Sequence, residues 1–298
     1  MIKNSFSVII PIKGKASSLR LSLSNFFHKD FEVIVVNDGA ENSISEAIKE
    51  FHQFLNIQEV KINPSKGSYH ARNCGAKKAN SEWLVFMDDG IELPDCWMST
   101  IEPFLSNYDY ICSNVKVKPS SSEKPIETLF RLTAFPCKKH FNMEGFGITA
   151  FLLVRQSILK KAGGFETVES GGDFLFGKAV SAINGRKKFI PKLIAWHEPK
   201  RLNQYIKDEI KYRTGKRLIE RRYLMKPPPS LLRNFIFFGK ELVKAGKRII
   251  LFWESPLWQK SDLPALTFWR SYLHYQALGL FVRIKAMNSE EKNKKIGS

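Results

Sequence analysis

The chain has 298 residues, enough for one large domain or for a domain with an appendage, and its 43% hydrophobic content suits a folded core. No apolar run reaches the roughly 18 residues of a membrane-spanning helix, and the apolar segment near the start is too short for a signal peptide. The four cysteines form no CxxC pair, so we expect neither a zinc site nor a disulfide framework, and we expect a cytoplasmic protein.

The net charge of +18 is concentrated in the last third of the chain. Residues 1–198 hold 25 Lys and Arg against 21 Asp and Glu, whereas residues 199–298 hold 22 against 8. We therefore expect a domain over 1–198 and a basic appendage over 199–298. Such an asymmetry favours a polyanionic partner for the appendage, either nucleic acid or the anionic face of a membrane.

Four short apolar runs begin at regular intervals in the first 90 residues. Their continuous apolar character is typical of strands buried on both faces. The segments between them have helical spacing, and this alternation predicts a mostly parallel sheet covered by helices on both faces. The four predicted strands are 6–12, 31–38, 57–62 and 82–88.

Acidic residues follow two of these strands. Asp38 ends the second strand, and Asp88 and Asp89 follow the fourth, at the edge where ligands of such sheets bind. An Asp-Gly turn explains one such acid, but several acids at one edge favour a ligand site. The chain has no GxGxxG after its first strand and no GxxxxGK[ST], which argues against NAD enzymes and P-loop NTPases. Without a glycine cradle, a diphosphate ligand would need a cation, and paired carboxylates holding Mg²⁺ or Mn²⁺ would supply it.

The second half of the first 198 residues holds two more candidate site residues. Segments 108–117 and 148–155 predict further strands. Asp173 follows two glycines and begins a helical run, where an Asp is either a helix cap or a carboxylate open to approach by a ligand. A last predicted strand ends at His197, and a lone histidine is more often structural than a metal ligand.

Taken in order, these segments resemble the family-2 glycosyltransferases, the inverting enzymes with the GT-A nucleotide-sugar fold. The resemblance covers roughly residues 5–198. It implies an α/β fold of the GT-A type, a three-layer αβα sandwich with a mostly parallel central sheet, here followed by a basic helical extension. The matching segments are "SVIIPIKGK", "VIVVNDG", "SKGSYHARNCGAKKANSEWLVFMDD", "GITAFLLVRQSILKKAGGF", "GGDFLFGKAVSAING" and "WH".

The resemblance also assigns a donor site. Asp38 matches the acid that binds the base of the nucleotide, and Arg72 in the "ARN" segment matches an arginine near the diphosphate. Asp88 belongs to the acid cluster that holds the ribose. Pro11, in the first matching segment, is also assigned to donor binding.

Three further residues are assigned to the metal ion and to the chemistry. Asp89 matches the DxD-type site that holds a divalent metal, expected to be Mn²⁺ or Mg²⁺. His197 matches an additional metal ligand of some members. Asp173 matches the catalytic base, which takes the proton of the acceptor hydroxyl as that oxygen attacks the anomeric carbon.

The chain departs from the family pattern at three positions. Gly90 stands where many members carry the third residue of DxD, so one carboxylate is missing and Asp89, or less suitably Glu92, would have to serve the metal. Asn37 replaces the first acid of the usual DDG, a smaller change because amides also bond to bases. Gly172 stands where an acid commonly precedes the base.

The basic tail carries a pattern but no catalytic motif. A predicted amphipathic helix over 232–253 has an apolar stripe opposite a basic cluster. It is either a helix packed on the domain with a solvated basic face or a helix lying in a membrane interface. The stripe comprises Leu232, Phe235, Ile236, Leu242, Val243, Ile249, Ile250 and Trp253, and the cluster comprises Arg233, Lys240, Lys244, Lys247 and Arg248.

The leading hypothesis is an inverting glycosyltransferase that moves a sugar from a nucleoside-diphosphate donor, expected to be a UDP-sugar, to a hydroxyl of a glycan or lipid-linked acceptor. We expect it to act in cell-envelope polysaccharide synthesis, peripherally on the inner face of the membrane. One alternative is a non-catalytic GT-A relative that only binds. The other is a nucleic-acid-binding protein that acts through the basic tail. We do not expect nucleic acid as a partner, because acids in a groove repel phosphate backbones.

Overall fold

The computed structural model describes residues 5–27, 30–39, 43–224, 239–240, 243, 247 and 256–294. The chain divides into two compact units. The first unit comprises Met1–Lys116 and Phe135–Glu198, and the second comprises Val117–Ala134 and Pro199–Ser298.

The first unit is built on one eight-stranded sheet in the order β3-β2-β1-β4-β7-β6-β8-β5. Strands β3, β2, β1 and β4 pair in parallel, and they match the four strands predicted from the apolar runs. The rest of the sheet adds antiparallel pairs, β4 with β7, β7 with β6 and β8 with β5, so the expected parallel order holds for only half of it. The strands are β1 Phe6–Ile12, β2 Glu32–Asp38, β3 Asn56–Ile62, β4 Trp83–Met87, β5 Ile91–Glu92, β6 Tyr110–Val117, β7 Phe151–Arg155 and β8 Lys187–His197.

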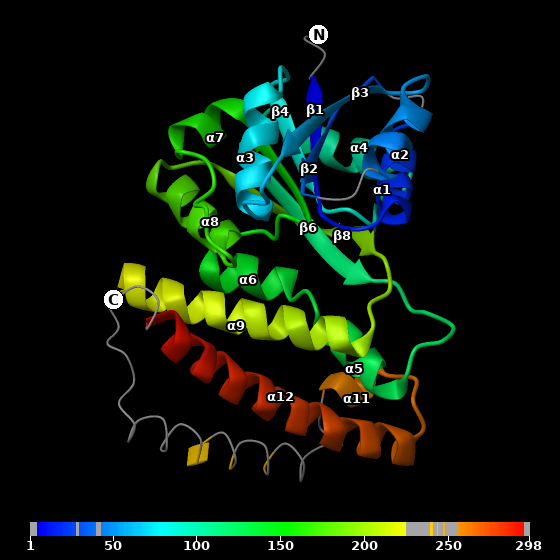
Figure 1. Ribbon diagram of the computed structural model, residues 1–298, viewed down its shortest axis with the longest axis vertical. Helices are drawn as coiled ribbons and strands as arrows, with labels where there is room; N and C mark the ends of the chain where they lie inside the picture. The colour runs from blue at the N-terminus through cyan, green and yellow to red at the C-terminus, as the bar shows by residue number, and fades with distance from the viewer. Residues whose placement is uncertain are drawn as a thin grey trace. The chain divides into compact units, whose positions relative to one another are not determined.

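Helices cover both faces of this sheet, which gives the three layers seen in Figure 1. Along β1, the side chains of Val8, Ile10 and Ile12 belong to one buried cluster, and Ile9 belongs to the cluster on the opposite face. The first cluster includes side chains of α1 Ala16–Leu23, α2 Ser43–Phe51 and α4 Trp97–Ile101, together with Cys137. The helices on the second are α3 Ser68–Lys78, α7 Gln156–Lys161 and α8 Gly172–Ala182. The unit also holds α6 Cys137–Glu144 and two 3₁₀ turns, η1 Ser24–Phe26 and η2 Glu102–Phe104.

The parallel half of the sheet places the candidate site. Strands β1, β2 and β4 point the same way, so their carboxyl ends meet at one edge. Asp38 is the last residue of β2, and Asp88 and Asp89 follow β4 directly. The sequence pattern predicted this convergence because the side chains belong to strands of one parallel order.

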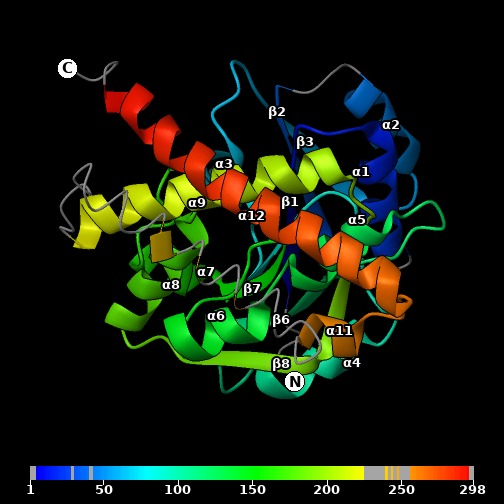
Figure 2. The ribbon, with the colours of Figure 1, turned by 90° about the horizontal axis from the view of Figure 1, so that it is seen from below.

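The second unit is helical and has a small aromatic core. The helices are α5 Pro125–Thr133, α9 Leu202–Leu224, α11 Pro256–Lys260 and α12 Ala265–Lys294. Helix α12 packs along α9 and α5 (Figures 1 and 2). Leu129 of α5 is buried with Phe268 and Tyr272 of α12, and the ring of Phe130 stacks on Tyr205 of α9 with centroids 5.7 Å apart. These contacts explain why 117–134 belongs to the second unit, although the sequence assigned it to the first.

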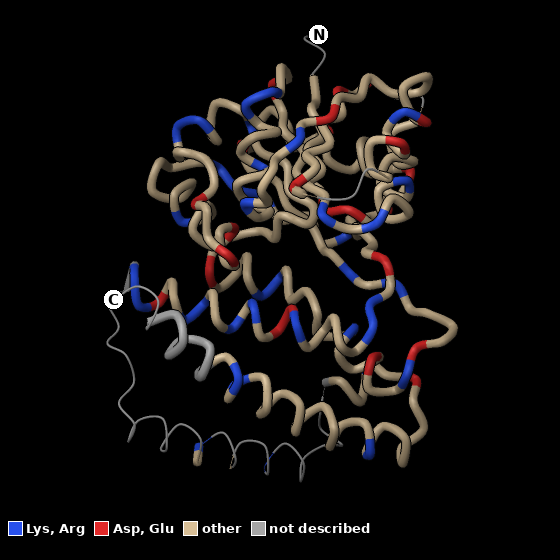
Figure 3. Tube along the Cα trace, viewed as in Figure 1, with Lys and Arg blue, Asp and Glu red and all other residues tan. Residues whose placement is uncertain are grey.

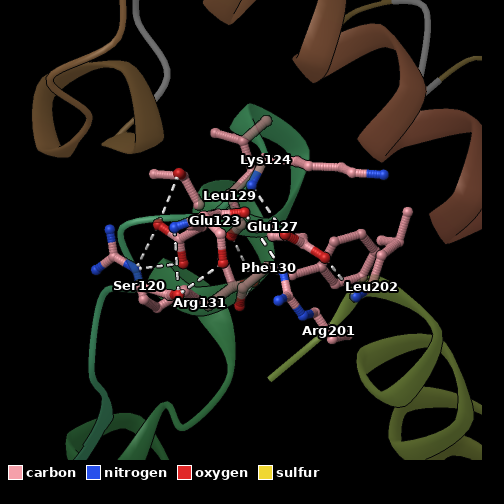
Figure 4. Close-up of polar contacts among 12 residues, drawn as sticks. Ser120, Glu123, Lys124, Glu127, Leu129, Phe130, Arg131, Arg201 and Leu202 are labelled. Carbon is pink, nitrogen blue, oxygen red and sulfur yellow. Dashed lines mark hydrogen bonds and ion pairs between the residues drawn. The ribbon is translucent and has the colours of Figure 1, made fainter. Parts of the chain in front are cut away.

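One buried carboxylate joins two helix starts in this unit. Glu127 is only 3% exposed. Its Oε2 accepts the backbone N–H of Lys124 at 2.8 Å, before the first turn of α5, and its Oε1 accepts the N–H of Leu202 at 2.8 Å, at the start of α9 (Figure 4). Backbone N–H groups at helix starts lack partners within the helix, so a carboxylate there stabilises both ends.

Basic residues recur along α9, as Figure 3 shows. The predicted amphipathic helix over 232–253 lies outside the described residues except at 239, 240, 243 and 247, of which Lys240, Val243 and Lys247 are exposed. Within the described parts of the chain, no helix combines the length and apolar character needed to cross a membrane.

We expect Glu127→Gln to destabilise the second unit by about 1–2 kcal/mol, because the amide keeps only one acceptor oxygen for two backbone N–H groups. Chemical denaturation, with hydrogen exchange of the first turns of α5 and α9, measures this. Glu209→Gln on α9 is the control, since Glu209 pairs with Arg213 across side chains that are each 37% exposed. The loss of such a partly exposed pair should cost less than about 0.5 kcal/mol. Equal costs for the two variants would contradict the bridging role.

Candidate functional site

A buried arginine and an acid face each other at the sheet edge. Arg72 on α3 is 3% exposed, and its Nη2 forms an ion pair with Oδ1 of Asp88, whose side chain is 32% exposed. Nε of Arg72 is also buried and has no hydrogen-bond partner among the described residues. Unpaired buried donors are costly and concentrate at functional sites. The structure thus brings together two of the predicted donor-site residues.

Asp38 holds the loop that leads into α3. Its Oδ1 accepts the N–H of Lys66 at 2.8 Å. Its Oδ2 accepts the N–H of Gly67 and the hydroxyl of Ser65, both at 2.9 Å. A carboxylate has about four acceptor positions, so one direction remains for a ligand beside these three bonds. Asp38 is only 3% exposed, and its carboxylate mainly holds this loop in place.

Gly90 stands at the position of the missing third acid, and the structure shows what surrounds it. Its backbone is left-handed, with φ of +77°, and a Cβ there would lie 2.8 Å from the carboxyl carbon of Glu198. Oε1 of Glu198 accepts the hydroxyl of Ser18 at 2.8 Å. A carboxylate therefore lies beside this position, although it comes from a different strand end.

Asp89 is directed to the loop after β1. A Cβ at Gly14 would clash with Oδ2 of Asp89, so the glycine makes room for this carboxylate. His197, the last residue of β8, pairs with Ile91 in the sheet register. Its Nδ1 lies 2.9 Å from the carbonyl oxygen of Glu198, and its ring stacks on Phe135. The sheet register thus places His197 opposite Ile91, two positions after Asp89.

Asp173 lies deep in the unit, at the first turn of α8. The helix is capped by Gly171, and Asp173 is 5% exposed. Its Oδ1 accepts the N–H of Phe174 at 2.9 Å and the hydroxyl of Tyr69 at 3.2 Å. The carboxylate therefore serves a first-turn N–H and a distant side chain at once. Asp173 is the second residue of α8 and Gly171 holds the N-cap position, so the expected cap role is wrong, although Asp173 does accept a first-turn N–H.

The ionisation of Asp173 is set by opposing effects. Burial raises the pKa of its carboxyl group above the usual value. The N–H of Phe174, the positive charge of Arg72 and the hydroxyl of Tyr69 act in the opposite direction. A carboxylate with a raised pKa is a stronger proton acceptor, which suits a general base.

Pro11 and the metal ligands complete the predicted set. Pro11 is buried inside β1, where it pairs with Val36 of β2. Among the described residues, no three His, Cys, Asp or Glu side chains are grouped so that they could hold a metal ion. Asp88 and Asp89 are two adjacent carboxylates, and the phosphate oxygens of a bound donor would add ligands for an ion.

Two residues at the site were not predicted from the sequence. Glu198 was missed because only the fold brings the end of β8 beside Gly90. Tyr69 was missed although its spacing offered a signal, since residues three apart on a helix share a face and Arg72 is three positions later.

Comparisons with known proteins identify the family of this chain. The sequence model described as Glycosyl transferase family 2 matches residues 7–162. Glycosyltransferase AglE of Haloferax volcanii is 24% identical over 270 residues, which cover 80% of this chain and 88% of that protein.

Two solved structures share the architecture. The mannosyltransferase PcManGT from Pyrobaculum calidifontis, in complex with GDP-Man and Mn²⁺, has a TM-score of 0.61 at 16% identity, over 95% of this chain and 86% of that chain. S. aureus TarS 1-349, in complex with UDP-GlcNAc, has a TM-score of 0.52 at 19% identity, over 72% of this chain and 65% of that chain. The predicted GT-A fold class is confirmed.

We expect Gly90→Ala to lower the free energy of unfolding by more than the strain of a positive φ, because the added Cβ would also meet the side chain of Glu198. Gly163 is the matched control, because its φ is +82° and a Cβ there meets nothing within 4 Å. Gly163→Ala should cost about 1 kcal/mol and Gly90→Ala roughly 2–4 kcal/mol, measured by denaturant unfolding. Adding Glu198→Ala should remove most of the difference. Equal costs at the two glycines would show that Glu198 moves aside freely.

Proposed function

Because this chain belongs to glycosyl transferase family 2, we propose that it is an inverting enzyme that moves a sugar from a nucleoside-diphosphate donor to an acceptor hydroxyl. The observation that supports this most directly is that a buried cation, Arg72, and a buried carboxylate, Asp173, interact electrostatically within one unit. Arg72 pairs with Asp88 at the carboxyl end of β4, and its charge acts on the buried carboxylate of Asp173. A cation for a leaving diphosphate and a base for a hydroxyl are what this reaction requires.

In the proposed mechanism, Asp173 takes the proton of the acceptor hydroxyl as the hydroxyl oxygen attacks the anomeric carbon. The nucleoside diphosphate leaves from the opposite face, so one displacement inverts the anomeric configuration. The guanidinium of Arg72 stabilises the negative charge that develops on the leaving group. Its placement costs no reorganisation during the reaction, because Asp88 and the packing of α3 already hold it.

The donor site is proposed to lie along the ends of β1, β2 and β4. Asp38, at the end of β2, would bind the base, and Asp88, after β4, would bind the ribose. Pro11 of the neighbouring strand β1 is also assigned to donor binding. We expect a UDP-sugar as donor. PcManGT was solved with GDP-Man and TarS with UDP-GlcNAc, so guanosine and uridine nucleotides are the two classes to compare. The proposed acceptor is a glycan or lipid-linked hydroxyl of the cell envelope.

A divalent cation is part of the proposal only together with the donor. PcManGT was solved in complex with GDP-Man and Mn²⁺, and Mg²⁺ is commonly held by one or two carboxylates plus substrate phosphates. Asp89, with Asp88 next to it, is the residue of this chain that would hold such an ion, and His197 is the expected additional ligand. When bound, the ion would supply positive charge to the diphosphate.

The second unit is proposed to hold the protein against an anionic membrane, on the inner face of the cell membrane. Most of the large apolar side chains exposed among the described residues belong to this unit. Exposed basic residues such as Lys207, Lys211 and Lys216 lie on α9. Apolar insertion and electrostatic attraction together give reversible binding. The apolar side chains are Tyr212, Leu218, Val243, Leu266, Phe281 and Ile284.

The test of the function begins with a screen of nucleotide-sugars for thermal stabilisation, with and without Mn²⁺. With a donor identified, we expect Asp173→Asn to lower kcat about 100-fold or more and to leave donor affinity near the wild-type value, because the amide cannot accept a proton. Steady-state kinetics and donor titration measure the two quantities separately.

Asp95→Asn is the control, since Asp95 is exposed and not part of the proposed site. It should change neither quantity. A variant at Asp173 that binds donor weakly but turns over normally at saturation would contradict the base assignment. A nucleotide-sugar that stabilises the protein but is neither transferred nor hydrolysed would favour a non-catalytic relative that only binds.

We expect the protein to sediment with vesicles that contain anionic lipid and to be released as salt rises, because salt screens the attraction. Lys240→Glu with Lys247→Glu should weaken sedimentation further, since both side chains are exposed in the basic tail. Lys77→Glu with Lys78→Glu, an equal charge change on exposed residues of the first unit, is the matched control. If the folded protein ignores anionic vesicles, the tail is a packing element with a solvated basic face.

A further inference from the structure

The side chain of Tyr69 occupies the space next to the residue that precedes Asp173. A Cβ at Gly172 would lie 2.8 Å from Cγ and Cδ2 of the Tyr69 ring and 2.9 Å from Cδ1. Any side chain at position 172 would therefore displace the ring. The ring of Tyr69 therefore packs where a side chain at position 172 would lie, so Tyr69 in this position requires glycine in place of the acid common in the family.

The ring of Tyr69 is fixed on its other sides as well. Phe165 lies 6.0 Å away between ring centroids, and the guanidinium carbon of Arg72 lies 5.3 Å from the Tyr69 centroid. Tyr69 is 8% exposed, so its hydroxyl has little access to water and needs a partner within the protein. That partner is Oδ1 of Asp173, at 3.2 Å.

The two hydrogen bonds to Asp173 leave one oxygen for chemistry. The hydroxyl of Tyr69 and the N–H of Phe174 both donate to Oδ1. The N–H of Asp173 itself also favours the ionised carboxylate. Oδ2 receives neither the Tyr69 bond nor the Phe174 bond, so it is the oxygen that can receive a proton. A rotation of the carboxylate would break both bonds.

We propose that Tyr69 is a positioning residue for the general base: its hydroxyl fixes the carboxylate of Asp173 so that Oδ2 is presented to the acceptor hydroxyl. This inference rests on the proposed function, because it takes Asp173 as the base. Tyr69 and Arg72 lie three positions apart on α3, so one helix face carries both the group that orients the base and the cation for the leaving diphosphate.

The hydroxyl also affects how Asp173 ionises. Burial, together with the negative charge of Asp173, raises the pKa of Tyr69 well above its usual value, so the hydroxyl stays protonated and remains a donor. Among the residues that the structure describes, the other ionisable groups that interact with Asp173 are Arg72 on α3, Tyr110 on β6 and Cys137 on α6. Burial raises the pKa of Tyr110 and of Cys137, which keeps both neutral. The Tyr69 hydroxyl is thus a neutral donor that lowers the pKa of Asp173, and its removal raises that pKa further.

The decisive variant is Tyr69→Phe, which removes the hydroxyl and keeps the ring that packs on Gly172. We expect kcat to fall about 10-fold, the scale of one hydrogen bond to a charged group, with the donor KM unchanged. The acidic limb of the pH–rate profile should move to higher pH. A carboxyl ¹³C NMR titration, with Asp173→Asn used to assign the resonance, should show the same direction without any substrate.

Tyr110→Phe is the matched control, because Tyr110 is another buried tyrosine of the same core cluster and its hydroxyl bonds to the backbone of Gly147 at 2.7 and 3.2 Å. It should lower stability and leave the pH profile and the Asp173 titration in place. An unchanged titration and kcat in Tyr69→Phe would overturn the positioning role. Full turnover in Asp173→Asn would instead overturn the base assignment, so the two failures are distinguishable.

Discussion

The close approach of α3 to the sheet is the constraint on which the site depends. A Cβ at Gly75 would lie 2.5 Å from Ile9 Cγ2 and 2.9 Å from Val36 Cγ2. Only a glycine lets the helix axis come this near to β1 and β2. At that separation, Arg72 is buried beside the strand ends, and a buried guanidinium must be paired to be tolerated. Asp88 provides the pair, and this makes an acid after β4 a structural necessity as well as a candidate ligand.

The same helix brings the donor end of the site and the proposed base into one electrostatic system. The charge of Arg72 acts on Asp88 by direct contact and on Asp173 at longer range. Burial alone would favour the protonated carboxylic acid at Asp173, and the neighbouring donors and the cation restore the tendency to ionise. A base of this kind is more basic than an exposed carboxylate and still ionised when a nearby cation supports it, which is the balance that proton abstraction from a hydroxyl requires.

Carboxylates in this protein hold backbone in place at several sites. Asp38 binds three donors of the loop before α3, and Glu127 joins the starts of α5 and α9 in the second unit. Loops and helix starts expose N–H groups that strands and helix interiors do not, and a short acidic side chain can satisfy two or three of them. An acid at a strand end in this fold therefore has a structural role beside any role toward a ligand.

The sequence by itself determined the first four strands, the three-layer class and the edge at which the acids gather, because these follow from local hydrophobic period and from the rule for parallel strands. It also identified Arg72 and Asp173 as residues of interest through their resemblance to family segments.

The antiparallel half of the sheet, the packing of 117–134 with the C-terminal helices and the placement of Glu198 beside Gly90 were decided only by the tertiary structure. Each depends on contacts between residues far apart in the chain, such as Ser18 with Glu198, 180 positions away. The local sequence pattern does not show which distant side chain fills a given space. The reason for a glycine at position 172 is therefore visible only in the fold, where the ring of Tyr69 packs against it.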